Sequence, residues 1–207
     1  MIKLVHTDVY GFDAAIRGMR NPMNSWDKSD SFEFPPDDDG IVWIGKNDLT
    51  LMRKLAHAGD DHGKFARFIN VTVDITAPLY WWKEFDTYKI GTVSNSCSTM
   101  HKIHEKEFEA RDFSCEHLLC ENIIYFGKTL ERLNTARAKY LESKNKVYWW
   151  QLIQLLPSSY NQKRTVQLNY QVLNRIYHAR KNHKLDEWHV FCDWVWGLPY
   201  FKEIYGE

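Results

Sequence analysis

The segment from His62 to His104 constrains the fold more than any other part of the chain. It opens with an alternating run whose one face carries Phe65, Arg67, Ile69, Val71, Val73 and Ile75. A period of two residues predicts a long β-strand beginning at Lys64. Pro78 then suits the first turn of a helix, because its missing N–H would have no partner there. The helix expected over residues 79–89 is rich in aromatic side chains, so much of it must be buried.

A polar segment follows this helix, from Gly91 to Thr99. Its residues are small or hydroxylic, and Val93 is the one branched apolar residue among them. Hydroxyl groups, an amide and backbone N–H groups suit a phosphate or another polar ligand. An ordinary Ser/Thr loop with a helix N-cap explains the same composition, so both interpretations stay open.

Composition sets the class of protein. The 207 residues fit one domain, and 27 basic residues balance 27 acidic ones, so no overall positive field favours long nucleic acid. Aromatic residues make up 15% of the chain, which suits a thick core, a subunit interface or a flat cofactor. No apolar run reaches the ~18 residues of a membrane span, and Met1 to His6 lacks the apolar segment of a signal peptide. We therefore expect a cytoplasmic protein with reduced thiols and no membrane contact.

Helical patterns dominate the remaining chain. A short strand at 2–5 and a helix from Asp13 precede a polar loop at 24–40, which we expect to be mobile. A helix capped by Asn47 or Asp48 ends at Gly59. Further helices are expected at about 114–141, 147–156, 164–181 and 185–195. The pattern predicts strands and helices in one domain, 1–207.

Two other kinds of site were weighed from the residues alone. A zinc site built from His101, His104, Cys115 and Cys120 matches common ligand spacings poorly, so we expect no metal. Cys97 lies between two serines near His101, where it serves either as a nucleophile or as a small residue in a tight ligand loop. Neither G-x-G-x-x-G nor a Walker A sequence occurs.

The order of these motifs resembles the flavin-dependent thymidylate synthases, the ThyX family, from about Asp13 to Trp194. Asp61-His62 stands where the family has Glu-His, followed by the strand and the aromatic helix. The family signature Arg-His-Arg-x-x-Ser-x-Asn-Glu-x-Ser-x-Arg-Tyr has diverged here. A gap-free reading sets Thr87-Tyr88-Lys89 on Arg-His-Arg, Asn95 on Glu and Cys97 on the second Ser; a shift of one position sets Asn95 on Asn and Ser98 on that Ser.

The C-terminal half is more similar to the family. The family has a Leu-Pro pair, a flavin-binding Asn and a nucleotide-binding Arg. At the same spacing this chain has Leu156-Pro157, Asn169 and Arg180. The family arginine two residues after that Asn is Gln171 here, and the arginine before Leu-Pro is missing. A phosphate dianion needs paired hydrogen-bond donors such as those of arginine. The missing arginines therefore remove donors that the family has for a phosphate.

The resemblance implies a mixed α/β fold with a central, mostly antiparallel sheet flanked by helices and a long-helix C-terminal half, assembled as a homotetramer with FAD. It implies methylation of dUMP to dTMP with methylenetetrahydrofolate and NADPH as co-substrates. The residues implied for cofactor binding are His62, Tyr88, Lys89, Asn95 and Asn169, and those for nucleotide binding are Ser96, Cys97, Ser98 and Arg180. No catalytic residue is assigned. The alternatives are a protein of this fold that has lost synthase activity and acts as a nucleotide-binding or structural module, or an enzyme for a different pyrimidine nucleotide.

Overall fold

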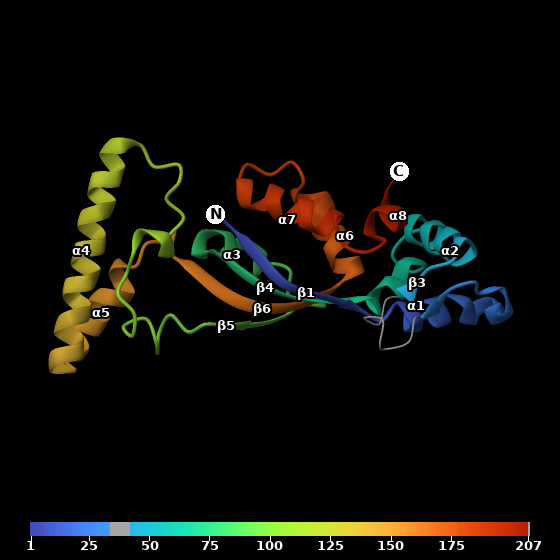
Figure 1. Cartoon of the computed structure of the whole chain (residues 1–207), viewed down its shortest axis with the longest axis horizontal. Coiled ribbons are helices and arrows are strands. Elements are labelled where there is room, and N and C mark those ends of the chain that lie inside the picture. The colour runs from blue at the N-terminus through green and yellow to red at the C-terminus, as the bar shows by residue number, and fades with distance from the viewer. Residues whose placement is uncertain (34–41, 207) are drawn as a thin grey trace. The chain divides into compact units, whose positions relative to one another are not determined.

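The computed structural model describes residues 1–33 and 42–206 as a mixture of helices and strands (Figure 1). Its elements in chain order are β1 (Lys3–Tyr10), α1 (Phe12–Arg20), the 3₁₀ helices η1 (Asn21–Met23) and η2 (Trp26–Lys28), β2 (Phe32–Glu33), β3 (Val42–Trp43), α2 (Lys46–His57), η4 (Gly63–Arg67), β4 (Asn70–Pro78), α3 (Leu79–Phe85), β5 (Val93–Ser96), η5 (Ala110–Asp112), α4 (Cys120–Ser143), α5 (Lys146–Leu155), β6 (Asn161–Asn169), α6 (Tyr170–Arg180), α7 (Asp186–Trp196) and α8 (Phe201–Tyr205). The predicted mixed α/β class is confirmed. No described helix is both long enough and apolar enough to cross a membrane.

The main sheet is antiparallel, and its strands follow the order β1, β4, β6, β5. Strands β2 and β3 form a separate antiparallel pair in which Phe32 faces Trp43. Strand β4 alternates between buried and partly exposed residues, as the period of two predicted. Its buried residues are Val71, Val73, Ile75 and Ala77.

The described chain divides into two compact units. Unit 1 comprises residues 1–3, 74–87 and 94–165, and unit 2 comprises residues 4–73, 88–93 and 166–207. Strands β4 and β6 each begin in one unit and end in the other. The single domain expected from the sequence stays a prediction.

Unit 1 is built around the helical pair α4 and α5, which lie side by side (Figure 1). Its core is an apolar cluster in which aromatic rings meet edge to face. The buried members are Ile103, Phe108, Phe113, Leu133, Ala136 and Leu152. Unit 2 packs α6 against α7 and η4, and α2 against α8 and η4. Within it, the buried Tyr170 donates its hydroxyl to the carbonyl of Pro199 at 2.6 Å.

Two expected elements were wrong in part. The strand does not begin at Lys64, because residues 63–67 form η4, in which the neighbours Phe65 and Ala66 are both buried. Adjacent burial cannot occur on one face of a strand. The helix expected over 164–181 is instead strand β6 up to Asn169, followed by α6.

Helix boundaries moved elsewhere. The long helix begins at Cys120 rather than near Ser114, whose N–H donates to the Ser159 carbonyl at 2.8 Å. Helix α8 was not expected from the sequence. Of the loop predicted at 24–40, residues 24–33 contain η2 and β2, and the remainder, including Pro35 to Gly40, lies outside the described residues.

Neither Asn47 nor Asp48 caps α2, whose N-cap is Gly45. The side chain of Asp30 accepts from the backbone N–H groups of Asn47, at 2.9 Å, and Asp48, at 3.1 Å. A carboxylate from a distant loop therefore stabilises the start of this helix.

Candidate functional site

Helix α6 separates two of the predicted site residues in unit 2, one at each of its ends. Asn169 is its N-cap, with Oδ1 accepting from the N–H of Val172 at 3.0 Å, and Arg180 is its last residue. A helix of this kind rises 1.5 Å per residue, so the two Cα atoms are about 16 Å apart along its axis. The backbones of Asn169 and Arg180 are therefore separated by the full length of α6.

Residues 88–93, which we call the strap, belong to the same unit as α6 and pack against it. Gly91 has a φ of 78°, a left-handed conformation that favours glycine. A Cβ atom at Gly91 would lie 2.9 Å from Cγ2 of Val172 and 3.2 Å from Nδ2 of Asn169. The glycine therefore allows the strap to approach the N-terminus of α6 closely.

At the other end of α6, the strap residue Tyr88 contacts Arg180. The Nε–H of Arg180 donates to the Tyr88 hydroxyl at 2.7 Å. The guanidinium carbon lies 4.8 Å from the ring centre of Trp188 and 5.5 Å from that of Tyr88. Trp188 is completely buried in α7, so its ring is a fixed surface for this cation. Tyr88 therefore contacts a predicted nucleotide residue, although the resemblance implied a cofactor role for it.

A second polar group in unit 2 surrounds Gln171, which is 7% exposed. Its Oε1 accepts from Nε of Arg67, and its Nε2 donates to the carbonyl of Asp60 at 3.2 Å. The Asp60 carboxylate forms an ion pair with Arg175. His62, the predicted flavin histidine, is exposed and precedes η4, which carries Arg67. Lys89 of the strap is also exposed.

The remaining predicted residues, Asn95 to Ser98, lie in unit 1 and are described there by themselves. Asn95 and Ser96 are exposed in β5. Cys97 is held by both of its backbone polar groups: its N–H donates to the Lys163 carbonyl at 2.9 Å, and its carbonyl accepts from Nε2 of Gln162 at 2.8 Å.

The Gln162 side chain that holds Cys97 is itself fixed. Its Oε1 accepts from Nε of Arg164 at 3.0 Å, and its backbone carbonyl accepts from the indole N–H of Trp82 at 3.0 Å. The guanidinium of Arg164 lies 4.1 Å from the ring centre of Trp82 and forms an ion pair with Asp86 at 2.7 Å. The backbone of Cys97 is therefore held by strand β6, through Lys163 and the buried Gln162, while Cys97 itself is exposed.

A cavity of about 260 Å³ in unit 1 is lined by Cys97 and Ser98. The Ser98 hydroxyl accepts from the N–H groups of Met100, at 3.1 Å, and His101, at 3.0 Å. Other lining groups include Lys102, Lys106, Asp112 and Tyr160. The Lys106 ammonium is paired with the Asp112 carboxylate at 2.8 Å, so positive charge here is balanced.

Burial raises the pKa values of two side chains, Tyr160 of unit 1 and Cys192 of unit 2. Burial, reinforced by the charges of Asp112 and Cys97, raises the pKa of Tyr160 above its usual value of 10. Burial raises the pKa of the Cys192 thiol to about 11. Cys192 is therefore unreactive, whereas Cys97 is accessible.

Metal-ligating side chains do not cluster in the part of the chain that the structure describes. No three His, Cys, Asp or Glu residues among residues 1–33 and 42–206 are grouped so as to hold a metal ion. His101 is exposed, and the ring of His104 packs edge-on against Tyr140 at 4.9 Å.

Sequence reasoning missed Arg67 and Trp188 as parts of these polar groups. Arg67 was placed on one face of a predicted strand, although an arginine among five apolar residues is an anomaly that could have marked it. Trp188 was assigned no role, and its contact with Arg180 depends on the packing of α7 against α6.

The chain was compared with known proteins by sequence and by structure. No protein-family model matches it, and no curated protein matches it in sequence. By structure it is similar to thymidylate synthase X (ThyX) from Helicobacter pylori, crystallised with FAD and dUMP: the TM-score is 0.72 at 17% identity, over 98% of this chain and 96% of that one. A second crystal structure of the flavin-dependent thymidylate synthase ThyX from Helicobacter pylori, complexed with FAD and dUMP, gives a TM-score of 0.71 at 18% identity, over 97% and 96% of the two chains.

These similarities extend over nearly the whole chain at low sequence identity, so they establish the fold. The chain therefore has the fold of the flavin-dependent thymidylate synthases, as the order of its motifs predicted.

Proposed function

We propose that this protein is a flavin-dependent enzyme that methylates dUMP to dTMP with methylenetetrahydrofolate and NADPH. The observation that carries the proposal is the shared fold with ThyX proteins holding FAD and dUMP, together with Asn169 and Arg180 at the two ends of α6. Fold alone does not determine chemistry, so the residues must also suit the ligands.

The residues of unit 2 fit a flavin dinucleotide. Because the carboxamide oxygen of Asn169 caps α6, its Nδ2 can donate to a ligand carbonyl. Gly91 leaves no side chain over that amide. His62 and Lys89 are exposed and supply an imidazole and an ammonium group. We propose these residues as contacts of the flavin. The flavin contact expected of Asn95, which belongs to unit 1, is a separate proposal.

When bound, a flavin would supply the hydride transfer of the reaction. The protein's own residues would bind and orient the nucleotide. Arg180 presents a guanidinium whose position is fixed by Tyr88 and Trp188. We propose Arg180 as a contact of the nucleotide. For unit 1, taken by itself, we propose the hydroxyl groups of Ser96 and Ser98 and the thiol of Cys97 as nucleotide contacts.

A homotetramer is the proposed assembly. Helix α4 carries exposed apolar side chains near its N-terminus, with Leu119 67%, Ile123 51% and Ile124 63% exposed. Exposed apolar residues on neighbouring turns of one helix are typical of a surface that another subunit covers.

A binding and turnover assay tests the proposed function. The purified protein is saturated with FAD and freed of unbound cofactor, and its visible spectrum is recorded. It is then supplied with dUMP, methylenetetrahydrofolate and NADPH, and both dTMP formation and NADPH oxidation are measured. We expect retained flavin and dTMP that depends on all three additions. Retained flavin without dTMP would contradict the synthase activity alone, and absence of flavin binding would contradict the flavoprotein as well.

The second candidate is a protein of this fold that binds a nucleotide without converting it. It is favoured by the replacement of the signature arginines, since Thr87 and Lys89 stand where the family has Arg. Binding of dUMP in the absence of dTMP formation would favour this candidate.

A further inference from the structure

Arg67 differs from three other arginines of unit 2 in the balance of its charge. Arg17, Arg20 and Arg175 of the same unit each pair with a carboxylate. Among the described residues, no carboxylate lies within salt-bridge distance of Arg67, which is exposed and bonded to the neutral amide of Gln171. A guanidinium that keeps its charge at the surface can bind an anion without first breaking an ion pair.

The position of Arg67 is fixed from beneath. Gln171 is 7% exposed, and its carboxamide is held at both ends: Oε1 accepts from Arg67, and Nε2 donates to the Asp60 carbonyl at 3.2 Å. Because Nε of Arg67 faces Gln171, the rest of the planar guanidinium projects beyond this contact. The buried amide therefore orients the exposed cation.

Arg67 also lies among residues proposed for the flavin. It ends the 3₁₀ helix η4, which begins directly after His62, and its partner Gln171 follows the N-cap Asn169 by two residues. Helices η4 and α6 pack against each other within unit 2. Gln171 occupies the sequence position at which the resembled family has an arginine, so η4 brings a guanidinium next to the position where α6 lacks one.

We propose that Arg67 binds the diphosphate of the flavin dinucleotide, replacing from η4 the arginine that α6 lacks. This inference rests on the proposed function, because it presumes a flavin in unit 2. An arginine suits the ligand because its planar N–H groups match phosphate oxygens in pairs. Gln171 acts as a positioning residue for that contact.

The test compares the affinities of three flavins that differ in phosphate: FAD, FMN and riboflavin. They are titrated into the cofactor-free full chain and into the Arg67→Gln variant, with fluorescence quenching as the readout. The matched control is Arg53→Gln, which removes the same charge from an exposed arginine whose partner is also a neutral oxygen, the Gly206 carbonyl at 3.2 Å. We expect Arg67→Gln to weaken FAD about 10- to 100-fold, as for the loss of a charge-assisted hydrogen bond, and to weaken FMN as well. Riboflavin binding should not change, and Arg53→Gln should resemble the wild type.

A double variant tests the proposed replacement directly. Arg67→Gln combined with Gln171→Arg returns the arginine to α6, and we expect it to recover most of the lost FAD affinity. A general loss of structure could not be recovered in this way, because the second change alters a buried residue.

The outcomes separate this inference from the proposed function. If the wild type binds FAD and Arg67→Gln binds it equally well, the diphosphate contact is overturned and the flavoprotein stands. An equal loss for riboflavin and FAD would also overturn the contact, because it would show that Arg67 acts through the protein structure. If the wild type binds none of the three flavins, both proposals are overturned.

Discussion

Arg180 illustrates how one side chain can depend on residues from several parts of the chain. Its guanidinium contacts Tyr88 of the strap and Trp188 of α7, and both contacts constrain its plane. An arginine held in this way loses less conformational freedom when it binds a ligand, which improves affinity.

Replacing Tyr88 or Arg180 tests this dependence. Arg180→Ala should weaken dUMP binding by about 2 kcal/mol or more, because a charge-assisted contact is lost. Tyr88→Phe keeps the ring and removes the hydroxyl, so it should weaken dUMP by about 1 kcal/mol. In the Arg180→Ala background Tyr88→Phe should have no further effect, since the hydroxyl acts through Arg180.

Calorimetric titration of dUMP into the four proteins of this cycle provides the measurement. Tyr148→Phe, a change at a partly exposed tyrosine of unit 1, is the control and should leave affinity unchanged. Additive losses in the double variant would show that Tyr88 contacts the ligand independently.

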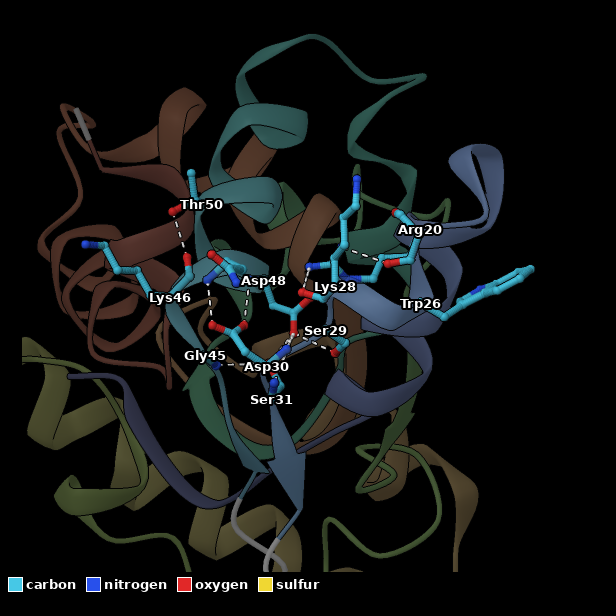
Figure 2. Close-up of polar contacts among 12 residues, drawn as sticks. Arg20, Trp26, Lys28, Ser29, Asp30, Ser31, Gly45, Lys46, Asp48 and Thr50 are labelled. Carbon is cyan, nitrogen blue, oxygen red and sulfur yellow. Dashed lines mark hydrogen bonds and ion pairs between the residues drawn. The ribbon is translucent and has the colours of Figure 1, made fainter.

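The carboxylate of Asp48 joins three parts of unit 2 (Figure 2). It lies in α2 and contacts both α1 and the segment that precedes β2. Asp48 is 0% exposed and forms an ion pair with Arg20 at 2.6 Å. It also accepts from the hydroxyl groups of Ser29 and Ser31, both at 2.7 Å. Arg20 in turn donates to the carbonyl groups of Ser25, at 3.1 Å, and Lys28, at 3.0 Å. Each charged group thus has the partners that burial requires.

Asp48→Asn should destabilise unit 2 by about 3–5 kcal/mol, because it leaves Arg20 buried without a counter-charge. Burial raises the pKa of Asp48, but its hydrogen bonds with Ser31, Ser29, Arg20 and the backbone of Asp30 together bring it below its usual 3.8. The stabilisation is therefore complete above the unfolded pKa near 3.8 and is lost as the pH falls through the lower folded value. Urea unfolding at pH 7, and at intervals down to pH 3, measures both effects. Asp27→Asn, at an exposed carboxylate, is the control and should change neither the stability at pH 7 nor its dependence on pH.

The elements also show what the sequence can and cannot predict. The alternation over Val71, Val73 and Ile75 predicted the central part of β4 correctly, because one face of that strand is buried. Val166 and Leu168 fit both a strand and a helix stripe, so the sequence favoured a helix where β6 lies. The segment forms a strand because it pairs with β4 and β5 in the sheet, and the local sequence does not encode that pairing. Asp48 fits an N-cap by its position in the sequence, whereas its burial depends on a distant loop.

At the scale of the whole molecule, the proposed homotetramer predicts that α4 is a subunit contact. Ile123→Glu combined with Ile124→Glu should lower the molecular mass in solution, because two buried charges would cost several kcal/mol at an interface. Light scattering after size-exclusion chromatography measures the mass. Met23→Glu, at a residue of unit 2 that is 81% exposed, is the control. An unchanged mass in the α4 variant would contradict the role of this helix.

The site as a whole was predictable only in part. The spacing of Asn169 and Arg180 in the sequence marked the segment that contains α6. In unit 2 the strap contacts α6 through Gly91 and through Tyr88. The roles of Arg67 and Gln171 could not be predicted, since a residue in η4 and a residue in α6 are brought together by packing over 104 positions of sequence. Ligand contacts remain predictions for all of these residues.

Helix α6 carries the proposed flavin contact Asn169 and the proposed nucleotide contact Arg180 on one regular element. The Cα atoms of Asn169 and Arg180 are about 16 Å apart along its axis, so the proposed flavin and nucleotide contacts start from fixed points at a set separation. A synthetic compound carrying a flavin mimic and a uridylate mimic at that separation would engage both ends at once, and its affinity would rise steeply when the linker length matches the helix.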